Sequence, residues 1–519
     1  MPLLIVTPEL VVLAATDLQR IASTLNTAHT AAGISTTRIA TAAADEVSTA
    51  AATVFAQYGQ QFHALSNQAD TFHQQFVQKL TTGSASYLGA EATSMSTLQA
   101  AAQHNARETI NAPTQILLGR PLIGNGANGT AAHPDGGAGG LLLGNGGAGY
   151  SPTTPWVSGG TGGSAGLIGQ GGTGGTGGAY ANGGAGGRGG WLLGIGGNGG
   201  PAGTGAIGGD GGAAGLIGIG GTGGNGALGG FGGQGGVLSG GTGANGVSTP
   251  GSGTVRLTMQ AVTEPVVYIS VNGGPTVPVL VDTGSTGLVI PLQYIGTEQS
   301  LGSPTGFGTS GYSGGLTYSF QTYQTTVSFG NGIVTTPTSV NAPTAAQPFL
   351  NFLEPAGVVG VLGIGTNAGG PGPSSVTTAL PGNFGHGVLI NQQQGYLHFG
   401  TAPPVTGISV TGAPIANVAV SINGGPTVSA YATIDSGGVY GTIPSAVLGT
   451  GQTSGNVPAG TTISVYTSNG HTLLYSYTTT NTNSPTVISG GLMNSGNEPF
   501  MQQPVYISNS GIGTTIFYG

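Results

Sequence analysis

Two aspartates in the second half of this 519-residue chain lie in nearly the same surroundings. Asp282 follows the apolar run VPVLV and begins D-T-G, whereas Asp435 follows AYATI and begins D-S-G; no other aspartate occurs after residue 254. Two carboxyl groups held together share one proton, so one can accept a proton from water while the other donates to a carbonyl oxygen. The pattern therefore indicates hydrolysis by a pair of acids.

Each aspartate belongs to one copy of an internal duplication. The segments NGGPTVPVLVDTGSTGLVIP (272–291) and NGGPTVSAYATIDSGGVYGTIP (423–444) differ by a two-residue insertion before the acid, and each acid is followed nine residues later by a proline. Related strands would bring both carboxyl groups within hydrogen-bonding reach. In the alternative interpretation each Asp caps a turn, which explains neither the duplication nor the lack of other aspartates.

The residues that follow each acid suit a paired site. Gly284 and Gly437 leave room for backbone to approach the carboxylates, because glycine has no Cβ. The hydroxyls of Thr283 and Ser436 could cross-link the two loops, and Ser285 could donate to the first acid.

Composition excludes several other functions. The chain has 107 glycines, no cysteine, and 15 acids against 7 bases, for a net charge of −8. Few basic residues are available for phosphates, so neither nucleic acid nor an anionic membrane is an expected partner. Without cysteine there is no disulfide, thiolate nucleophile or thiolate metal site. His386, His398 and His471 show no metal-ligand spacing, and no metal or organic cofactor is implied.

Three compositions divide the chain. Residues 1–112 are Ala-rich, with a helix start at Thr7-Pro8-Glu9, a turn near 33–41 and a second apolar stripe over about 43–80. This predicts a helical hairpin with an apolar face left for a helical partner, and no stretch is apolar enough to span a membrane. Residues 113–253 form a linker and a Gly-Gly-x array. This composition predicts a flexible spacer, and the alternative is a stack of extended polyglycine-type helices. Residues 254–519 predict an all-β domain.

Other hydrolase motifs are present but lack their usual context. G-x-S-x-G around Ser313, with Asp435 and His471, has the chain order of an α/β-hydrolase, yet no helix is expected after Ser313. His133 and the D-S-G-G around Ser436 suggest a serine protease, but they lie about 300 residues apart. The paired acids are the preferred interpretation.

The β domain resembles the pepsin-like aspartic proteases over most of residues 260–519. GYSGGLTYSFQTYQTTVSFGNG resembles the family's flap hairpin, which makes Tyr312 the flap tyrosine that closes over substrate. VVGVLGIG at 358–365 resembles the strand behind the first acid, and PFMQQPVYISNSGIGTTIFYG resembles the last strands. The resemblance implies a bilobal fold with Asp282 and Asp435 as catalytic residues.

Departures from that family pattern concern the second acid. Gly438 stands where a hydroxyl residue is usual, so Asp435 is expected to lack one hydrogen bond that Ser285 gives Asp282. The apolar-apolar-Gly strand behind Asp435 is replaced by VISGG at 487–491. A catalytic site is still the preferred interpretation, and Gly438 motivates the alternative, a non-catalytic display or host-interaction protein that keeps the protease fold.

The N-terminal half resembles the PE-PGRS family of mycobacterial proteins through TPE at 7–9, AAADEVS at 42–48, YLGAE at 87–91 and INAPTQILLGRPLIGNGANG at 110–129. Tyr87 and Glu91 match the family's Y-x-x-x-[DE] signal. The resemblance implies type VII secretion with a PPE-type helical partner and a secretion chaperone, and a location in the outer envelope, on the cell surface or outside the cell. The expected substrates are peptides or proteins, including co-exported PE-type proteins or the chain itself.

Overall fold

The computed structural model describes residues 8–260, 263–313 and 315–519. The chain divides into two compact units, Met1–Pro113 and Thr114–Gly519. The second unit holds both the glycine array and the β domain.

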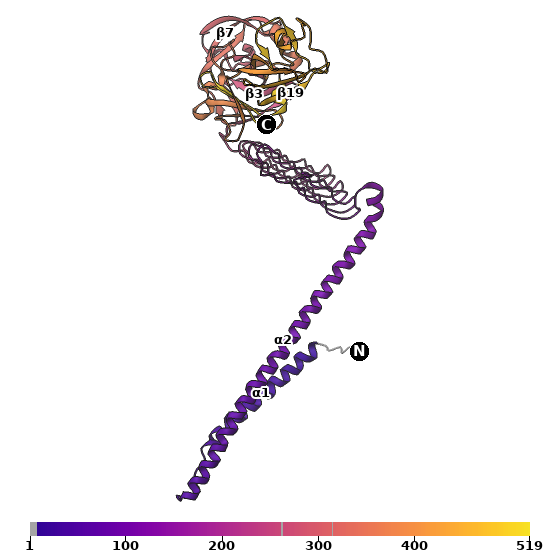
Figure 1. Ribbon diagram of the computed structural model, residues 1–519, viewed down its shortest axis with the longest axis vertical. Coiled ribbons are helices and arrows are strands. Elements are labelled where there is room, and N and C mark those ends of the chain that lie inside the picture. The colour runs from indigo at the N-terminus through magenta and orange to yellow at the C-terminus, as the bar shows by residue number, and fades with distance from the viewer. Residues whose placement is uncertain (1–7, 261–262, 314) are drawn as a thin grey trace. The chain divides into compact units, whose positions relative to one another are not determined.

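The first unit is the predicted helical hairpin, formed by α1 (Pro8–Thr37) and α2 (Glu46–Leu118) (Figure 1). Asp45 precedes α2, and its carboxylate accepts the Ser48 amide at 2.7 Å and the Ser48 hydroxyl at 2.8 Å, so these hydrogen bonds lower the pKa of Asp45. α2 runs well past the apolar stripe at about 43–80, since no strong helix breaker interrupts it before Pro113. None of the helices in the described ranges is both long and apolar enough to cross a membrane.

Large apolar side chains of the hairpin face solvent, whereas its buried positions are mostly small. Two helices alone cannot enclose an apolar stripe on each, which leaves a surface suited to a further helix. The helical partner stays a prediction. The exposed apolar residues of the second helix include Val54, Phe55, Tyr58, Phe62, Leu65, Phe72 and Phe76.

The glycine array is ordered, and its reading as a flexible spacer is wrong. Extended segments lie side by side and bond through their backbones, as where the Gly172 amide donates to Gly163 O and the Gly187 amide to Gly172 O, both at 2.8 Å. A Cβ on Gly172 would lie 1.9 Å from Gly147 O, so only glycine permits this spacing. Satisfied backbone groups and close packing replace the side-chain core that the array lacks.

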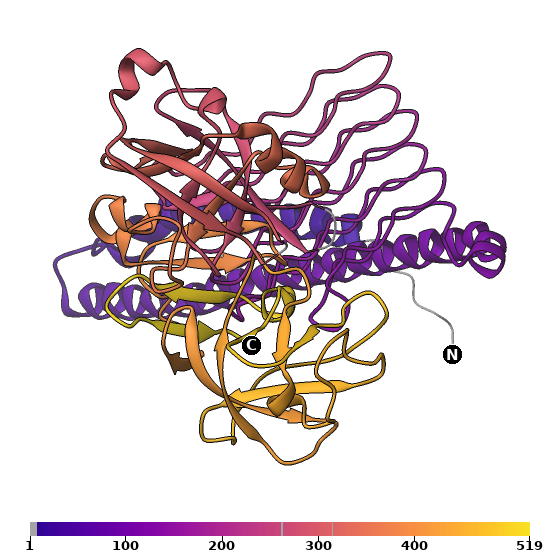
Figure 2. The same ribbon diagram turned by 90° about the horizontal axis from the view of Figure 1, so that it is seen from above.

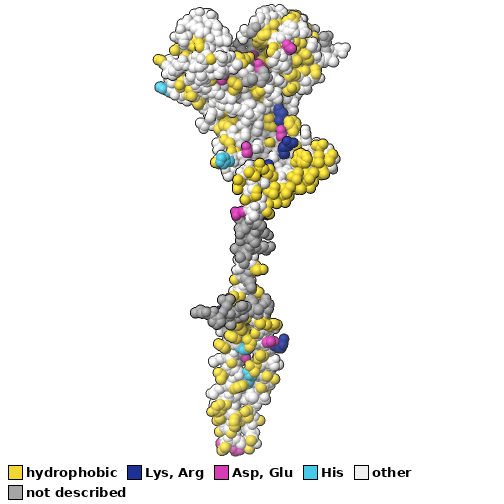
Figure 3. All heavy atoms as spheres, turned by 90° about the vertical axis from the view of Figure 1, so that its right-hand side faces the viewer, with side chains coloured by type: hydrophobic (Ala, Val, Ile, Leu, Met, Phe, Trp, Pro, Cys, Tyr) yellow, Lys and Arg dark blue, Asp and Glu magenta, His cyan; other side chains and the backbone are white. Residues whose placement is uncertain are grey.

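Apolar pairs recur along the array where its segments turn. Ile123, Leu143, Ile168, Leu193 and Ile217 form a row of parallel β-bridges, so successive turns lie in register (Figure 2). Apolar side chains gather along this edge in Figure 3, and several are exposed. The ladder of turns explains the regular recurrence of the Leu and Ile pairs in the sequence.

The β domain contains two lobes, as the pepsin-like resemblance implied, and a third sheet that joins them (Figure 2). The ten-stranded N-terminal sheet has the order β6-β7-β10-β5-β11-β4-β3-β8-β9, with β2 on β3. Its strands are β2 (Thr258–Gln260), β3 (Glu264–Val271), β4 (Val277–Asp282), β5 (Thr286–Val289), β6 (Gly306–Gly311), β7 (Thr317–Thr325), β8 (Val327–Gly330), β9 (Ile333–Val334), β10 (Thr338–Pro343) and β11 (Gly360–Ile364).

The C-terminal lobe and the joining sheet contain the remaining strands. The seven-stranded lobe has the order β19-β18-β15-β16-β21-β17-β20, and the six-stranded joining sheet has the order β1-β13-β12-β22-β23-β14. The lobe strands are β15 (Ile415–Ile422), β16 (Val428–Thr433), β17 (Thr442–Pro444), β18 (Thr462–Thr467), β19 (Leu473–Thr478), β20 (Thr486–Ile488) and β21 (Met493–Asn494). The joining strands are β1 (Thr254–Arg256), β12 (Gly387–Asn391), β13 (Tyr396–Phe399), β14 (Ile408–Thr411), β22 (Val505–Ser508) and β23 (Thr514–Phe517), and short helices are α3 (Glu298–Leu301), α4 (Ala346–Leu353), α5 (Ser445–Leu448) and α6 (Glu498–Gln502).

The two lobes repeat one pattern of strand pairing. β4 pairs in parallel with β11, and β16 pairs in parallel with β21; likewise β5 pairs in parallel with β10, and β17 with β20. The strand beside the second acid is therefore β21, whereas VISGG at 487–491 belongs to β20 and the turn after it. The assignment of VISGG to the strand behind Asp435 is wrong, because that place is taken by the next segment of the chain.

The array packs against the joining sheet. The Tyr396 hydroxyl donates to Tyr180 O at 2.7 Å, and the Asn182 amide donates to Gln394 Oε1 at 2.6 Å. Trp156 of the array lies between Tyr180 and Tyr518, with ring centroids 5.2 and 5.0 Å away. Buried aromatic and polar contacts of this kind join the array and the β domain into one unit.

A glycine substitution tests whether the array is packed. We expect Gly172→Ala to lower the free energy of unfolding of the array by at least about 2 kcal/mol, because its Cβ would overlap Gly147 O. Gly241→Ala is the matched control, since a Cβ there has no atom within 4 Å. Thermal unfolding and hydrogen exchange of the full-length variants measure the difference. Equal behaviour of the two variants would show that the array is loose.

Candidate active site

Asp282 and Asp435 meet between the two lobes, at the ends of equivalent strands. Asp282 ends β4, Asp435 follows β16, and each side chain is 7% exposed. The amide of Gly284 donates to Asp282 Oδ1 at 2.7 Å and to Asp435 Oδ1 at 3.1 Å, and the Gly437 amide donates to Asp435 Oδ1 at 3.0 Å. A single backbone amide therefore contacts both carboxylates, which places them in one buried site.

The two glycines allow each loop to lie against the opposite carboxylate. A Cβ on Gly284 would lie 2.5 Å from Asp435 Cγ, and a Cβ on Gly437 would lie 2.7 Å from Asp282 Cγ. Both separations are far shorter than van der Waals contact, so any larger residue would push the loops apart. The expected close approach at these glycines is confirmed.

Thr283 and Ser436 cross-link the loops as expected. The Ser436 amide donates to Thr283 Oγ1 at 2.8 Å, and the Thr283 amide donates to Ser436 Oγ at 3.1 Å. Each hydroxyl then donates to a carbonyl of the other lobe, Thr283 to Ile434 O at 2.6 Å and Ser436 to Val281 O at 2.8 Å. Four hydrogen bonds between fully buried residues hold the acids in register.

The Oδ1 atoms of the two carboxylates are the inner oxygens, which accept from the loop amides, and the Oδ2 atoms are the outer oxygens. The two outer oxygens accept hydrogen bonds from donors of different kinds. The Ser285 hydroxyl donates to Asp282 Oδ2 at 2.5 Å, and the Asn494 side-chain amide donates to Asp435 Oδ2 at 2.6 Å. The expectation that Gly438 leaves Asp435 one hydrogen bond short is therefore wrong. The sequence does not predict Asn494 as a site residue, because it lies 59 residues from Asp435 and in no motif. The pairing of β21 with β16 brings its side chain to Asp435.

The site is acidic, and among the described residues no basic side chain forms an ion pair with either aspartate. The only Lys or Arg from residue 254 onward is Arg256, which stacks on Phe231 of the array. Burial, and next the neighbouring Asp435 charge, raise the pKa of Asp282 well above its usual range. A proton held between the two carboxyl groups removes most of this repulsion, because only one of the two groups is then ionised.

Tyr312 lies at the tip of the β6–β7 hairpin, where the flap was predicted. Its ring stacks on Tyr318 and Phe352 with centroids 5.8 and 6.1 Å away, and burial raises the pKa of Tyr312 well above its usual range. The same hairpin covers an open cavity of about 450 Å³, lined in part by Phe307 and Phe320. Threonine side chains, among them Thr286 and Thr322, also line this space, so it offers both apolar and polar contacts.

The residues of the rival motifs are not assembled into triads. Ser313 lies in the β6–β7 turn, and His471 lies in the β18–β19 turn of the other lobe. The His471 amide donates to Asn469 Oδ1 at 3.0 Å, and His133 belongs to the array, where its amide bonds Thr130 O. Among the described residues none of these histidines is hydrogen-bonded to a candidate serine.

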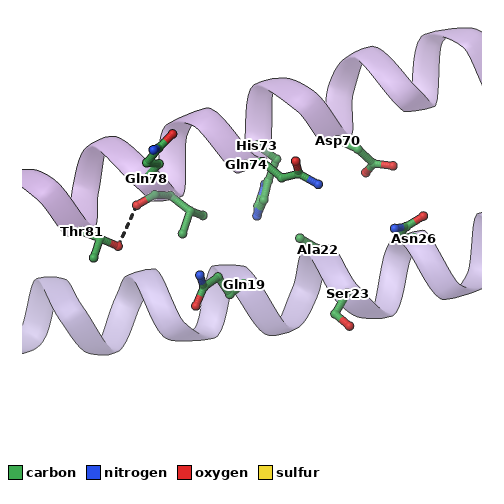
Figure 4. Close-up of a pocket in the computed structure, with 10 residues that line it drawn as sticks. Gln19, Ala22, Ser23, Asn26, Asp70, His73, Gln74, Gln78 and Thr81 are labelled. Carbon is green, nitrogen blue, oxygen red and sulfur yellow. Dashed lines mark hydrogen bonds between the residues drawn. The ribbon is translucent and has the colours of Figure 1, made fainter.

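The hairpin holds the other residues singled out in the sequence. Tyr87 lies on α2 with its side chain 74% exposed, and Glu91 lies one turn further on, although its side chain is outside the described part of the structure. A polar groove between the helices holds Asp70 and His73 (Figure 4). His73 Nε2 bonds Leu18 O at 2.9 Å, and no group of three acidic or histidine side chains suited to a metal occurs in the described residues.

The fold and the paired acids define the class of aspartyl peptidase-like proteins, and the comparisons agree. A family model described as "PE-PGRS C-terminal aspartyl peptidase-like domain" matches residues 253–515, while the PE family model matches 4–94 and the PGRS repeats model matches 123–192. The chain belongs to the PE-PGRS family and carries its aspartyl peptidase-like domain.

Relatives of full length are found in two mycobacteria. The protein is 53% identical to "PE cleavage protein A" of Mycobacterium tuberculosis, over 100% of this chain and 99% of that one, and 52% identical to the Mycobacterium marinum protein of the same name, over 100% of both. A crystal structure of the aspartic proteinase from Irpex lacteus matches 51% of this chain and 96% of that one, with 15% identity and a TM-score of 0.38.

The raised pKa of Asp282 predicts how stability depends on pH. The ordinary pKa is 3.8, and between that value and the higher folded value the folded protein keeps a proton that the unfolded chain has released. The free energy of unfolding contributed by this group therefore falls as pH rises through that window, by about 1.4 kcal/mol per unit of pKa shift. Asp282→Asn removes the titration.

We expect the wild type to lose stability relative to Asp282→Asn as pH rises from about 4 toward neutrality. Thermal unfolding of both full-length proteins at a series of pH values measures this difference. Asp135→Asn, in the array, is the control for a general effect of charge. A difference between wild type and Asp282→Asn that does not change with pH would contradict the raised pKa.

Proposed function

We propose that the protein is an aspartic endopeptidase in which a water held between Asp282 and Asp435 attacks a peptide carbonyl. The observation that carries the proposal is the Gly284 amide bonded to both inner carboxylate oxygens, at 2.7 and 3.1 Å. It keeps the two groups close enough to share a proton and act as base and acid in one step.

The reaction needs one proton on the pair. The ionised carboxylate takes a proton from the water as its oxygen bonds to the carbonyl carbon, while the other acid donates its proton to the carbonyl oxygen. The products of this step are a neutral tetrahedral diol and a pair that again holds one proton. Collapse of the diol breaks the C–N bond, with one acid protonating the nitrogen and the other accepting a hydroxyl proton, so no covalent enzyme intermediate forms.

The β6–β7 hairpin closes over the substrate, and Tyr312 is its contact with the reacting segment. Exclusion of water by the ring strengthens the electrostatic interactions of the buried pair. Thr283, Ser285, Ser436 and both loop glycines act through the carboxylates, which they hold in place.

The substrates that fit best are PE-type proteins, including this chain. The name "PE cleavage protein A" of the relatives supports this substrate class. The protein is exported by type VII secretion through its hairpin, with a PPE-type partner, a chaperone and the signal at Tyr87 and Glu91. It acts on the cell surface, in the outer envelope or after release.

A second candidate function is a surface display protein without catalysis. Gly438 suggested this function, because it has no hydroxyl that could donate a hydrogen bond to Asp435. Asn494 supplies that hydrogen bond instead, so Gly438 no longer supports the loss of catalysis. The paired acids therefore favour the peptidase.

Replacement of either acid tests the function. We expect Asp282→Ala and Asp435→Ala each to lower kcat/KM for peptide hydrolysis by at least about a thousandfold, because neither acid alone can supply both proton transfers. The assay uses full-length protein and a peptide library from pH 3 to 7, and Asp135→Ala is the control. A pepstatin-type inhibitor should block wild-type cleavage. Activity that survives either replacement would refute the shared pair, and a folded wild type without activity would favour the display function.

A second test addresses the substrate class. We expect the wild type, but not Asp282→Ala, to shorten co-expressed PE-type proteins, and mass spectrometry of the released peptides locates the cut sites. Asp210→Asn, a substitution in the array, is the control for expression and export. If the surface proteomes of wild-type and Asp282→Ala cells are identical, PE-type proteins are not the substrates.

A further inference from the structure

Position 438 and position 494 together determine what contacts the outer oxygen of Asp435. In the first lobe Ser285, three residues after its acid, donates to Asp282 Oδ2. In the second lobe the corresponding residue is Gly438, and the donor to Asp435 Oδ2 is the side chain of Asn494, at 2.6 Å. The two lobes thus satisfy equivalent oxygens from different strands.

The orientation of the Asn494 amide is determined by a second hydrogen bond. The Gly496 backbone amide donates to Asn494 Oδ1 at 2.8 Å. A backbone N–H can only donate, so the oxygen of the side chain must face Gly496 and its NH₂ group must face Asp435.

Gly438 and Asn494 depend on each other sterically. A Cβ on Gly438 would lie 2.8 Å from Asp435 Oδ2 and 2.9 Å from Asn494 Oδ1, closer than real Cβ contacts. A hydroxyl side chain at 438 and asparagine at 494 therefore cannot occupy the site together without movement. The absence of a side chain at 438 is what admits Asn494.

The change of donor makes the two acids chemically different. A serine hydroxyl can donate or accept, so Asp282 Oδ2 can carry a proton and still bond Ser285. The NH₂ group of Asn494 can only donate to Asp435 Oδ2, and such a bond is stronger when the carboxylate is ionised than when it is protonated. A donor of this kind stabilises the ionised carboxylate.

We propose that Asn494 is a positioning residue that keeps Asp435 as the ionised member of the pair, so that Asp435 is the base toward water and Asp282 holds the shared proton. This inference rests on the proposed peptidase function. The pKa of Asp282, raised by burial and by Asp435, is consistent with that division.

Few other titratable groups contact the pair. Asp282 on β4 is the neighbour of Asp435, and Tyr312 and Tyr318 of the flap hairpin interact electrostatically with Asp282. Glu498, two residues after Gly496, instead accepts the Asn483 side chain at 3.2 Å, and the Tyr440 side chain is exposed. Within the described residues, the hydrogen-bond donor to Oδ2 thus differs between the two acids, Ser285 for Asp282 and Asn494 for Asp435.

Two full-length variants at position 494 test the role. In Asn494→Ala the donor is lost, and we expect kcat to fall at least about tenfold while KM changes less than about twofold. The acid limb of the kcat/KM profile should move up by about one pH unit, because loss of a donor makes the carboxylate easier to protonate. Asn494→Asp keeps the shape and the Gly496 bond but replaces the donor by an acid, and it should move the limb further.

Rescue distinguishes positioning from simple loss of packing. Gly438→Ser alone should lower activity by crowding Asn494, whereas Gly438→Ser in the Asn494→Ala background should move the acid limb back toward wild type, since it supplies a hydroxyl donor. An unchanged acid limb in Asn494→Ala, or a double variant less active than both single variants, would overturn the proposal.

A readout that needs no turnover separates this proposal from the peptidase function. At a pH where the pair holds one proton, the ¹³Cγ resonance of Asp282 should move toward its ionised position in Asn494→Ala, because Asp435 then competes for the shared proton. An unchanged resonance would refute the role of Asn494 even in an active enzyme. If the wild type cleaves no peptide but the resonance moves as expected, the peptidase function fails and the influence of Asn494 on Asp435 stands.

Discussion

The burial of two carboxyl groups side by side, without a basic group to neutralise them, is the constraint on which the β domain depends. Like charges at this distance repel strongly in a medium of low dielectric constant. Hydrogen-bond donors stabilise the buried carboxylates. These donors are the amides of Gly284 and Gly437, the hydroxyl of Ser285 and the side chain of Asn494. The Thr283 and Ser436 cross-links then prevent the lobes from separating to relieve the repulsion.

Glycine has two separate structural roles in this chain. In the site, Gly284 and Gly437 let a loop touch the opposite carboxylate, and in the array glycines such as Gly172 let extended segments bond backbone to backbone. Both depend on the missing Cβ, and neither depends on flexibility. The contacts of Tyr396 with Tyr180 and of Gln394 with Asn182 then make the array part of the unit that contains the active site.

Local sequence patterns are enough to predict the two acids of the site. They do not predict contacts between residues that lie far apart in the sequence. The D-T-G and D-S-G copies predicted the pair and its flanking glycines because each copy carries its own strand and loop. Asn494 could not be found in this way, since it reaches Asp435 only through the β16–β21 pairing. The composition of the array predicts a flexible spacer because a high glycine content implies a large entropy cost of ordering the chain. It does not reveal the backbone hydrogen bonds that offset this cost in the folded array.

A count of the protons bound by Asp282 and Asp435 tests whether the two carboxyl groups share one proton. A potentiometric titration of the full-length wild type, from which that of the Asp282→Asn/Asp435→Asn double variant is subtracted, isolates the protons of the pair. We expect two separate steps, with the second well above the ordinary aspartate value of 3.8. Loss of both protons in one step near that value would show that the carboxyl groups titrate independently and share no proton.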